Sequence, residues 1–112
     1  MASSKEFVEY TVEQLRDSGS ISYRRMFGEY GWYCNGKFLG VISDDQLFVK
    51  FTPEAAQAFP DIPKAPPYKG AKDYFLIEDI DDQELLTKLV RFTWEALPES
   101  KPKKGRNLNG SF

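Results

Sequence analysis

Two β-prone runs flank the dipeptide Asn35-Gly36 in the stretch GWYC-NG-KFLGVI, and this pattern constrains the fold more than any other in the sequence. Both residues of a type I′ turn need positive φ angles, which asparagine and glycine adopt readily, so the pattern predicts a two-residue β-hairpin. A loop of two residues also fixes the register of its strands. We therefore expect five cross-strand pairs, namely Cys34 with Lys37, Tyr33 with Phe38, Trp32 with Leu39, Gly31 with Gly40 and Tyr30 with Val41.

Further strands are predicted on both sides of this hairpin. Residues 21–27 alternate with a period of two and predict a preceding strand, and LFVKF at 47–51 predicts a following strand after a turn at Asp44-Asp45. Both faces of the expected sheet are apolar, which fits a sheet that is covered on each side or has one face in an oligomer interface. The first face would carry Tyr33, Phe38, Ile42, Leu47, Val49 and Phe51, and the second Tyr30, Trp32, Leu39, Val41 and Phe48.

Two glycines lie inside the predicted hairpin strands, and a third, Gly28, lies between the first predicted strand and the hairpin. In the expected register Gly31 and Gly40 meet on one face and leave a shallow trough, where a helix could cross with unusually close approach. Gly28 is expected to mark a bulge or bend before the hairpin. We interpret these glycines as architectural.

Helices are predicted on either side of the strand run. Residues 4–17 carry an apolar stripe at helical spacing after Ser3 or Ser4, Thr52-Pro53 is a helix start signal, and the last helix is capped near Asp81 or Asp82. The proline-rich residues 60–72 predict an extended loop, and residues 73–78 a strand. This order predicts an α+β fold, in which a mainly antiparallel sheet, a meander of about four to five strands, packs with N-terminal and C-terminal helices. We expect one domain over residues 1–98 and a flexible basic tail over residues 99–112.

The composition removes several kinds of chemistry. The chain has no histidine, which is the commonest general base and transition-metal ligand, so a Ser-His-Asp or Cys-His site cannot be built. The one cysteine, Cys34, excludes intramolecular disulfides and multi-thiolate metal sites. We expect Cys34 to be accessible beside the hairpin turn, with its pKa somewhat lowered by Lys37 opposite. No catalytic residue, metal site or cofactor is expected.

The charge is distributed unevenly. Residues 99–112 hold four basic side chains against Glu99, whereas the whole chain has a net charge of −2, so residues 1–98 are acidic. An acidic body matches a phosphate backbone poorly, so we do not expect it to bind nucleic acid. The tail is either simply solvated or contacts nucleic acid through Lys101, Lys103, Lys104 and Arg106. The sequence has no signal-peptide pattern and no apolar run long enough for a membrane span, so a cytoplasmic location without membrane contact is expected.

Three segments together resemble one known family. RRMFGEYGWYCNGKFLGVISDDQLFVK, PYKGAKDYFLI and the helix ending EALPESKPKK are similar to the N-terminal domain family of the competence regulator TfoX, also called Sxy, here as a stand-alone domain without the C-terminal domain. The resemblance covers about residues 5–104. It implies a role like that of the founding members, which promote expression of DNA-uptake genes together with a cyclic-AMP-responsive activator. It also implies a fold shared with small α+β interaction modules.

Arginine, lysine and tyrosine side chains in these segments are the candidate interaction residues. Arg24 and Arg25 alternate across their strand and so point to opposite faces. In one interpretation one arginine is solvated and the other pairs with an acid such as Glu29 or Asp73. In another, the arginines form a site for an anion or a partner's carboxylate together with Lys50, Lys72 or Tyr68. Tyr68 is also predicted to pack beside the strand that carries the arginines. The candidate set is Arg24, Arg25, Glu29, Tyr68, Lys72 and Tyr74.

These observations favour a non-enzymatic regulatory or protein-interaction domain, whose partner is a protein such as a transcription component or a second copy of the chain. The alternative is a small domain that binds an anionic ligand, or acts on it as an enzyme, through an Arg/Tyr/Lys site. A cleft that holds Arg25, Lys72 and Tyr74 would favour the alternative. A flat apolar patch repeated across a two-fold axis would favour the interaction domain.

Overall fold

The computed structural model describes residues 3–26 and 28–97. The tail residues Lys101, Lys103, Lys104 and Arg106 lie outside the described residues, as does the boundary predicted at residue 98. In chain order the elements are α1 (Lys5–Leu15), the 3-10 helix η1 (Arg16–Ser18), β1 (Ile21–Met26), β2 (Glu29–Cys34), β3 (Lys37–Ser43), β4 (Gln46–Val49), α2 (Pro53–Ala58), β5 (Lys64–Ala65), β6 (Tyr74–Ile77) and α3 (Gln83–Ala96).

The predicted α+β fold with an antiparallel sheet is confirmed. Within the described residues the sheet has six strands in the order β1-β2-β3-β4-β6-β5, and every pairing is antiparallel. The strand beyond the predicted number is β5, which lies in the segment predicted as a loop and pairs with β6. A strand of two residues that lies among prolines is too short to show a period-two pattern in the sequence.

Each of the three α-helices within the described residues begins at one of the predicted N-caps. The side-chain oxygens of Ser4, Thr52 and Asp82 each accept a hydrogen bond from the backbone N–H three residues further on. Such a bond satisfies one of the N–H groups that a helix start leaves without a partner. Because this chemistry involves only four consecutive residues, the sequence alone can locate it.

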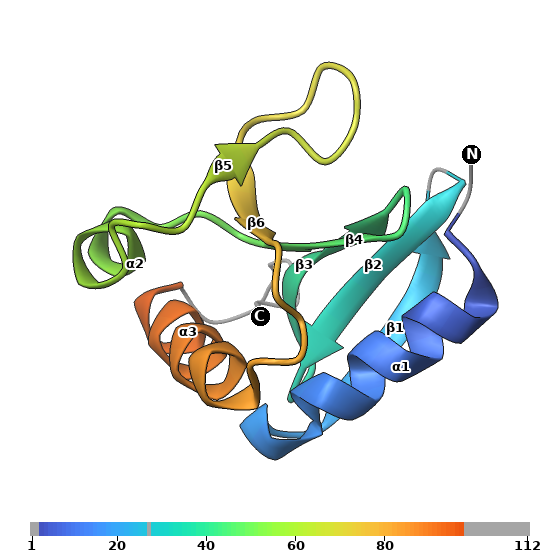
Figure 1. The fold of residues 1–112 in the computed structure, drawn as a ribbon, viewed down its shortest axis with the longest axis horizontal. Coiled ribbons are helices and arrows are strands. Elements are labelled where there is room, and N and C mark those ends of the chain that lie inside the picture. Colours follow the sequence, from blue (N-terminus) through green and yellow to red (C-terminus); the bar gives the residue numbers. More distant parts are fainter. Residues whose placement is uncertain (1–2, 27, 98–112) are drawn as a thin grey trace, which may run out of the picture.

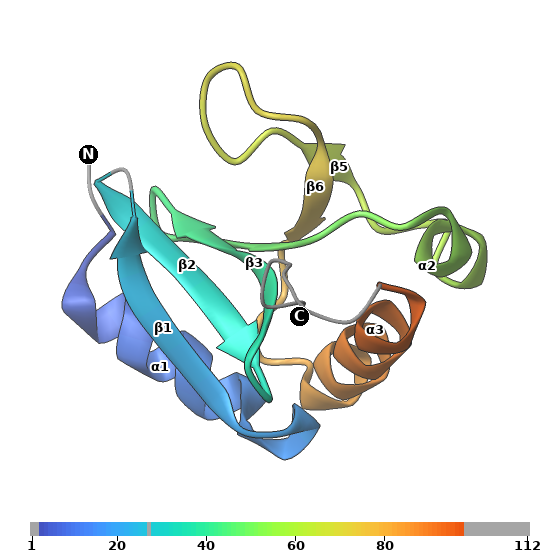
Figure 2. The same ribbon diagram turned by 180° about the vertical axis from the view of Figure 1, so that it is seen from behind.

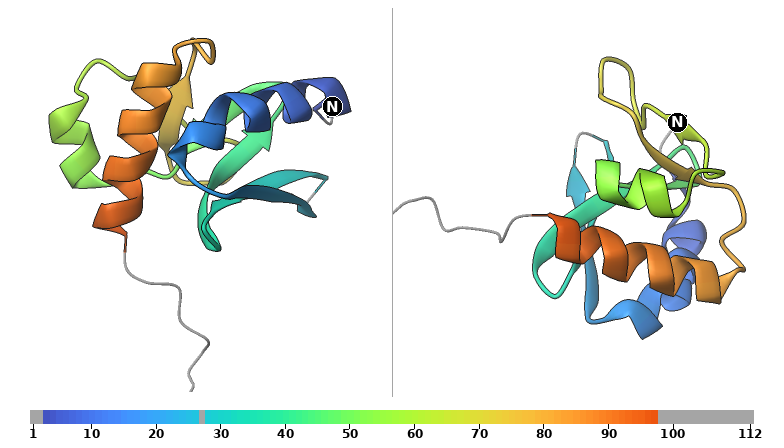
Figure 3. Two further views of the ribbon diagram at one scale, coloured as in Figure 1. Left: turned by 90° about the horizontal axis from the view of Figure 1, so that it is seen from below. Right: turned by 90° about the vertical axis from the view of Figure 1, so that its left-hand side faces the viewer.

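The helices pack against one face of the sheet. α1 and α3 lie on the same side of it, and α2 lies along α3 (Figures 1 and 3). The loop between β5 and β6 projects from the other side of the sheet, as Figures 1 and 2 show. The core between helices and sheet is formed by Val8, Leu15, Trp32, Cys34, Leu39, Ile42, Leu47, Val49, Ala55, Phe75, Ile77, Leu86, Leu89 and Val90.

Both predicted hairpin turns have the backbone that a type I′ turn requires. Asn35 and Gly36 have φ angles of 51° and 83°, and Asp44 and Asp45 have φ angles of 54° and 55°. The register that Asp44-Asp45 fixes is confirmed, since Ile42 pairs with Leu47 and Gly40 pairs with Val49. Gly28, with a φ of 78°, lies in the turn between β1 and β2.

The register predicted for the first hairpin is correct only next to its turn. Cys34 pairs with Lys37 and Tyr33 with Phe38, but further on the partners are Trp32 with Gly40, Gly31 with Val41 and Tyr30 with Ile42. A β-bulge causes the shift, because Leu39 is an extra residue in β3 at the break between Trp32 and Tyr33.

The bulge changes which side chains share a face, since a one-residue slip moves a side chain to the other side of a sheet. Trp32 shares the helix-covered face with Ile42 and Val49 rather than the opposite one, so the predicted membership of the two faces is wrong around the bulge. Gly31 and Gly40 lie on opposite faces, and the trough between them is not formed. The close approach to Gly40, which was expected from a crossing helix, is made by the Trp32 side chain instead. The Trp32 Nε1–H donates to the Phe48 carbonyl at 3.0 Å, and the indole lies over Gly40.

Candidate functional site

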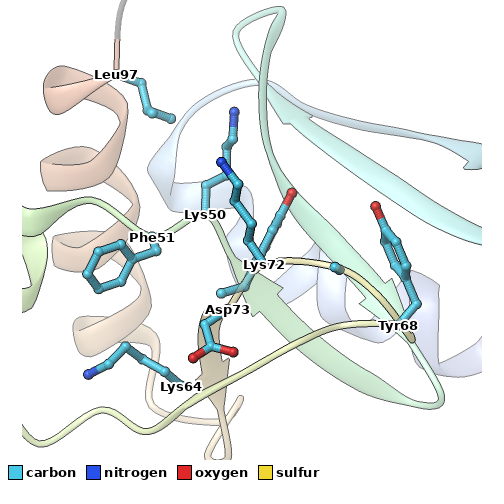
Figure 4. Close-up of a pocket in the computed structure, with 9 residues that line it drawn as sticks. Lys50, Phe51, Lys64, Tyr68, Lys72, Asp73 and Leu97 are labelled. Carbon is cyan, nitrogen blue, oxygen red and sulfur yellow. The ribbon is translucent and has the colours of Figure 1, made fainter.

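A cleft of about 800 Å³ opens beside the β5–β6 hairpin (Figure 4). It is assembled from the chain after β4, the β5–β6 hairpin and loop, and the end of α3. Its lining residues are basic, aromatic or small apolar, with one carboxylate: Lys50, Phe51, Lys64, Tyr68, Ala71, Lys72, Asp73, Tyr74 and Leu97. We call it the lysine–tyrosine cleft.

Lys50 reaches the cleft because the sheet continues past β4. Its backbone N–H donates to the Leu39 carbonyl at 2.7 Å, so the bulge residue supplies the last hydrogen bond between these strands. Lys50 Nζ lies 5.5 Å from the centroid of the Phe38 ring, on the face opposite the core. Lys50 is half-buried, and its side chain lines the cleft.

The loop between β5 and β6 places two more side chains. A turn is closed by the hydrogen bond from Ala71 N–H to the Tyr68 carbonyl, at 3.1 Å, and Gly70 in this turn has a φ of 85°. A positive φ at the third residue is the signature of a type II turn, which glycine adopts without strain. This turn sets Tyr68 and Lys72 on the wall of the cleft, next to Tyr74 at the start of β6.

The cleft is basic although residues 1–98 are acidic as a whole. Three lysines line it against the single carboxylate of Asp73. Figure 4 shows the side chains of Lys50 and Lys72 pointing the same way, while Asp73 points away from them. The Tyr74 hydroxyl is neutral near physiological pH, as an ordinary tyrosine is, and can donate a hydrogen bond. Burial, and secondarily the nearby Tyr68, raises the pKa of Tyr74 further. The cleft can therefore bind an anion.

The structure brings together only part of the predicted site. Tyr68, Lys72 and Tyr74 line one cleft, but Arg24 and Arg25 lie on β1 and are not among its lining residues. Both arginines are exposed, and within residues 3–26 and 28–97 neither forms the predicted ion pair with Glu29 or Asp73. The Arg25 guanidinium instead lies 5.3 Å from the centroid of the Tyr30 ring.

Glu29 has a different role from the predicted pairing with an arginine. Its two carboxylate oxygens accept hydrogen bonds from the backbone N–H groups of Ser3 and Asp44, both at 2.9 Å. The same segments meet twice more, since Ser3 Oγ accepts from Asp45 N–H at 3.0 Å and the Asp45 carboxylate accepts from Ser4 N–H at 2.9 Å. Glu29 thus helps to hold the start of α1 on the β3–β4 turn.

The expectation for Cys34 is wrong. Cys34 is 1% exposed, and its thiol donates a long hydrogen bond of 3.5 Å to the Ser18 carbonyl. Burial raises its pKa, and Lys37 does not lower it because Lys37 Nζ donates to the carbonyls of Trp94 and Leu97 instead. The sequence pattern placed Cys34 beside a turn but did not show that α3 covers the turn.

We expect the native Cys34 thiol to react with a chromogenic disulfide reagent about 100-fold more slowly than the thiol of the urea-unfolded chain. A raised pKa means less thiolate at a given pH, and burial blocks access. The measurement is the rate of colour release at several values between about pH 7 and 9. Equal rates for native and unfolded protein at the same pH would contradict the buried placement.

Sequence reasoning missed Lys64 and Leu97 as parts of the cleft. Lys64 Nζ lies 5.9 Å from the centroid of the Phe51 ring, and Leu97 closes the wall from the end of α3. The sequence gives no signal for either residue, because the strand pairing of β5 and the position of the end of α3 are long-range features.

Comparison with known proteins places the chain in a family. The family model of the TfoX N-terminal domain matches residues 13–97, from the last turn of α1 to the residue that follows α3. The chain belongs to the TfoX N-terminal domain family. A protein of Spirochaeta aurantia, described as an uncharacterized 12.7 kDa protein in the trpE 5′ region, is 32% identical over 107 residues, which are 95% of this chain and 93% of that protein.

The residues of this chain that match the TfoX N-terminal domain include β1 and all the residues that line the lysine–tyrosine cleft. Among the described helices, none has the length and apolar character needed to cross a bilayer. The described residues also contain no group of three or more His, Cys, Asp or Glu side chains placed to hold a metal ion.

Proposed function

We propose that this domain is a non-enzymatic interaction module with a regulatory role, and that it binds an extended acidic segment of a partner protein along the free edge of β1. The observation that supports the proposal best is an edge strand with two exposed arginines. β1 is the first strand of the sheet, and within the described residues no strand lies on its outer side (Figure 2). Arg24 and Arg25 are exposed on it and form no ion pair with a described residue.

Strand addition would use this edge directly. An edge strand presents backbone N–H and C=O groups that another chain can pair with, and side chains then select the partner. Arg24 and Arg25 point to opposite faces, so two consecutive acidic residues on an added strand would meet one arginine on each face. The backbone would supply affinity, and the arginines would select for negative charge.

The arginines also argue against a second copy of the chain at this edge. Two antiparallel β1 strands would bring four arginines together, and like charges opposite each other destabilise a strand pair. The partner is therefore a different, acidic protein, and a transcription component of the kind that the family resemblance implies is one candidate. The absence of histidine from the chain and the burial of Cys34 favour a role other than catalysis.

A charge-reversal experiment tests this function. A photo-reactive residue at exposed Ser22 is expected to crosslink one acidic protein in native cell extract, and Arg24→Glu/Arg25→Glu is expected to abolish that crosslink. The control Lys5→Glu/Lys69→Glu makes the same change in charge at exposed positions outside β1 and should keep it. An acidic peptide from the captured protein should then protect β1 amides of the purified domain from hydrogen exchange. Recovery of the same protein with both double variants would refute docking at β1.

A further inference from the structure

The lysine–tyrosine cleft is separate from the β1 edge, and the proposed function makes no use of it. We propose that the cleft is a binding site for a small phosphomonoester with a ring-bearing, apolar body. The phosphate lies between Lys50 and Lys72, and the body lies against Phe51 and Leu97.

The dimensions of the cleft suit a small molecule. Its volume of about 800 Å³ falls within the range of roughly 300–1,000 Å³ that is usual for such sites. Such sites combine apolar walls with a few polar groups that fix the orientation of the ligand. The cleft has this character, with Phe51, Ala71, Leu97 and two tyrosine rings as walls and lysines beside them.

The charges of the cleft favour a ligand with two negative charges. Lys50 and Lys72 come from distant parts of the chain, yet they line the same cavity and point the same way (Figure 4). Within the described residues neither forms an ion pair, and Asp73 points away from both. Two ammonium groups that face a common space repel each other unless an anion lies there. A phosphate dianion can neutralise both, whereas a carboxylate carries only one charge.

The type of cation and the nearby hydroxyl also fit a phosphate. A lysine ammonium group is a compact point charge, which binds phosphate without the planar geometry that an arginine–carboxylate pair requires. Tyr74, whose side chain lines the cleft, supplies a neutral hydroxyl donor, and burial and Tyr68 raise its pKa further above the ordinary value. The negative charge of the phosphate would therefore meet donors only, from Lys50, Lys72 and Tyr74.

The apolar half of the cleft favours a ligand whose apolar part covers an aromatic ring. Phe51 is 38% exposed, although one side of its ring packs on Phe75 with 5.3 Å between the centroids. Leu97 lies on the same wall. A ring-bearing ligand would cover this exposed apolar surface, whereas inorganic phosphate would leave it in contact with water.

Three small probes separate the parts of the proposal: phenyl phosphate, inorganic phosphate and benzoate. In an NMR titration of the purified protein, phenyl phosphate is expected to shift the amide signals of residues 50–51 and 68–74 in a saturable way. It should bind about tenfold more tightly than inorganic phosphate, because its ring is buried, and about tenfold more tightly than benzoate, because it carries a second charge. Equal binding of benzoate would overturn the phosphate assignment. Failure of phenyl phosphate to shift these signals would overturn the site.

Matched lysine variants show whether the site is specific. Lys50→Met and Lys72→Met are each expected to weaken phenyl phosphate binding about tenfold, while the amide spectrum stays that of a folded protein. Lys69→Met removes the same charge from an exposed position in the same loop that does not line the cleft, and should change affinity less than about twofold. An equal loss with Lys69→Met would mean that only general charge attracts the probe, and would overturn the proposal. Arg24→Glu/Arg25→Glu should leave the cleft unaffected, so the two proposals can fail separately.

Discussion

Gly40→Ala is expected to lower the free energy of unfolding by about 4 kcal/mol or more, which is most of the stability of a small domain. A Cβ atom at position 40 would lie 2.1 Å from the Phe48 carbonyl oxygen and 2.5 Å from Trp32 Nε1. Neither atom can move cheaply, because the carbonyl belongs to the neighbouring strand and the fully buried indole donates to that same carbonyl. The measurement is urea unfolding followed by tryptophan fluorescence.

Gly31→Ala is the matched control for this prediction. A Cβ atom at position 31 would meet the Phe38 ring at 3.0 Å and the end of the Met26 side chain at 3.1 Å. Methionine has three rotatable bonds and can shift, so we expect a loss of less than about 1 kcal/mol. If both glycine variants were equally stable, the close packing of Trp32 over Gly40 would be wrong.

Lys37→Met is expected to lower the free energy of unfolding by about 2–4 kcal/mol. Lys37 is 7% exposed, and its Nζ donates to the Trp94 and Leu97 carbonyls at 2.9 and 3.1 Å. These groups belong to the end of α3, where carbonyls lack helical partners and the helix dipole favours a cation. The ammonium group also lies 3.9 Å from the centroid of the Trp94 ring. Methionine keeps most of the volume but none of these interactions.

The comparison for Lys37→Met is Lys69→Met, which removes a charge from an exposed lysine and should change stability by less than about 0.5 kcal/mol. Thermal and urea unfolding of both variants measure the difference. A stability of Lys37→Met within that same margin of the wild type would show that Lys37 does not hold α3.

The features that the sequence predicts well are those made by a few consecutive residues. The N-caps at Ser4, Thr52 and Asp82 and the turns at Asn35-Gly36 and Asp44-Asp45 are all where their residue types indicate. Each depends on local hydrogen bonds or on the φ angles that particular residues tolerate. The three α-helices, the strands other than β5 and the fold class follow from these signals together with the hydrophobic period.

The bulge could not be predicted for a physical reason. Leu39 lies in FLGVI, a run without a polar side chain, so an extra residue leaves no break in the alternation of polar and apolar positions. Gly40 did indicate a close approach, but the sequence cannot name the atom that approaches. The cleft was missed in part for a similar reason, because Lys50, Lys64 and Leu97 meet only through tertiary structure.

Leu97 connects the cleft to whatever polypeptide follows it. Because Leu97 lies on the cleft wall, any segment or domain attached after this residue starts at the rim of the cleft. A short tether of that kind gives the attached part an effective concentration at the cleft in the millimolar range, far above that of a free partner. If the cleft binds a small phosphomonoester as proposed, an acidic group soon after the position of Leu97 in a longer protein built on this domain would compete with that ligand for the same lysines, and ligand binding would displace the attached part from the cleft.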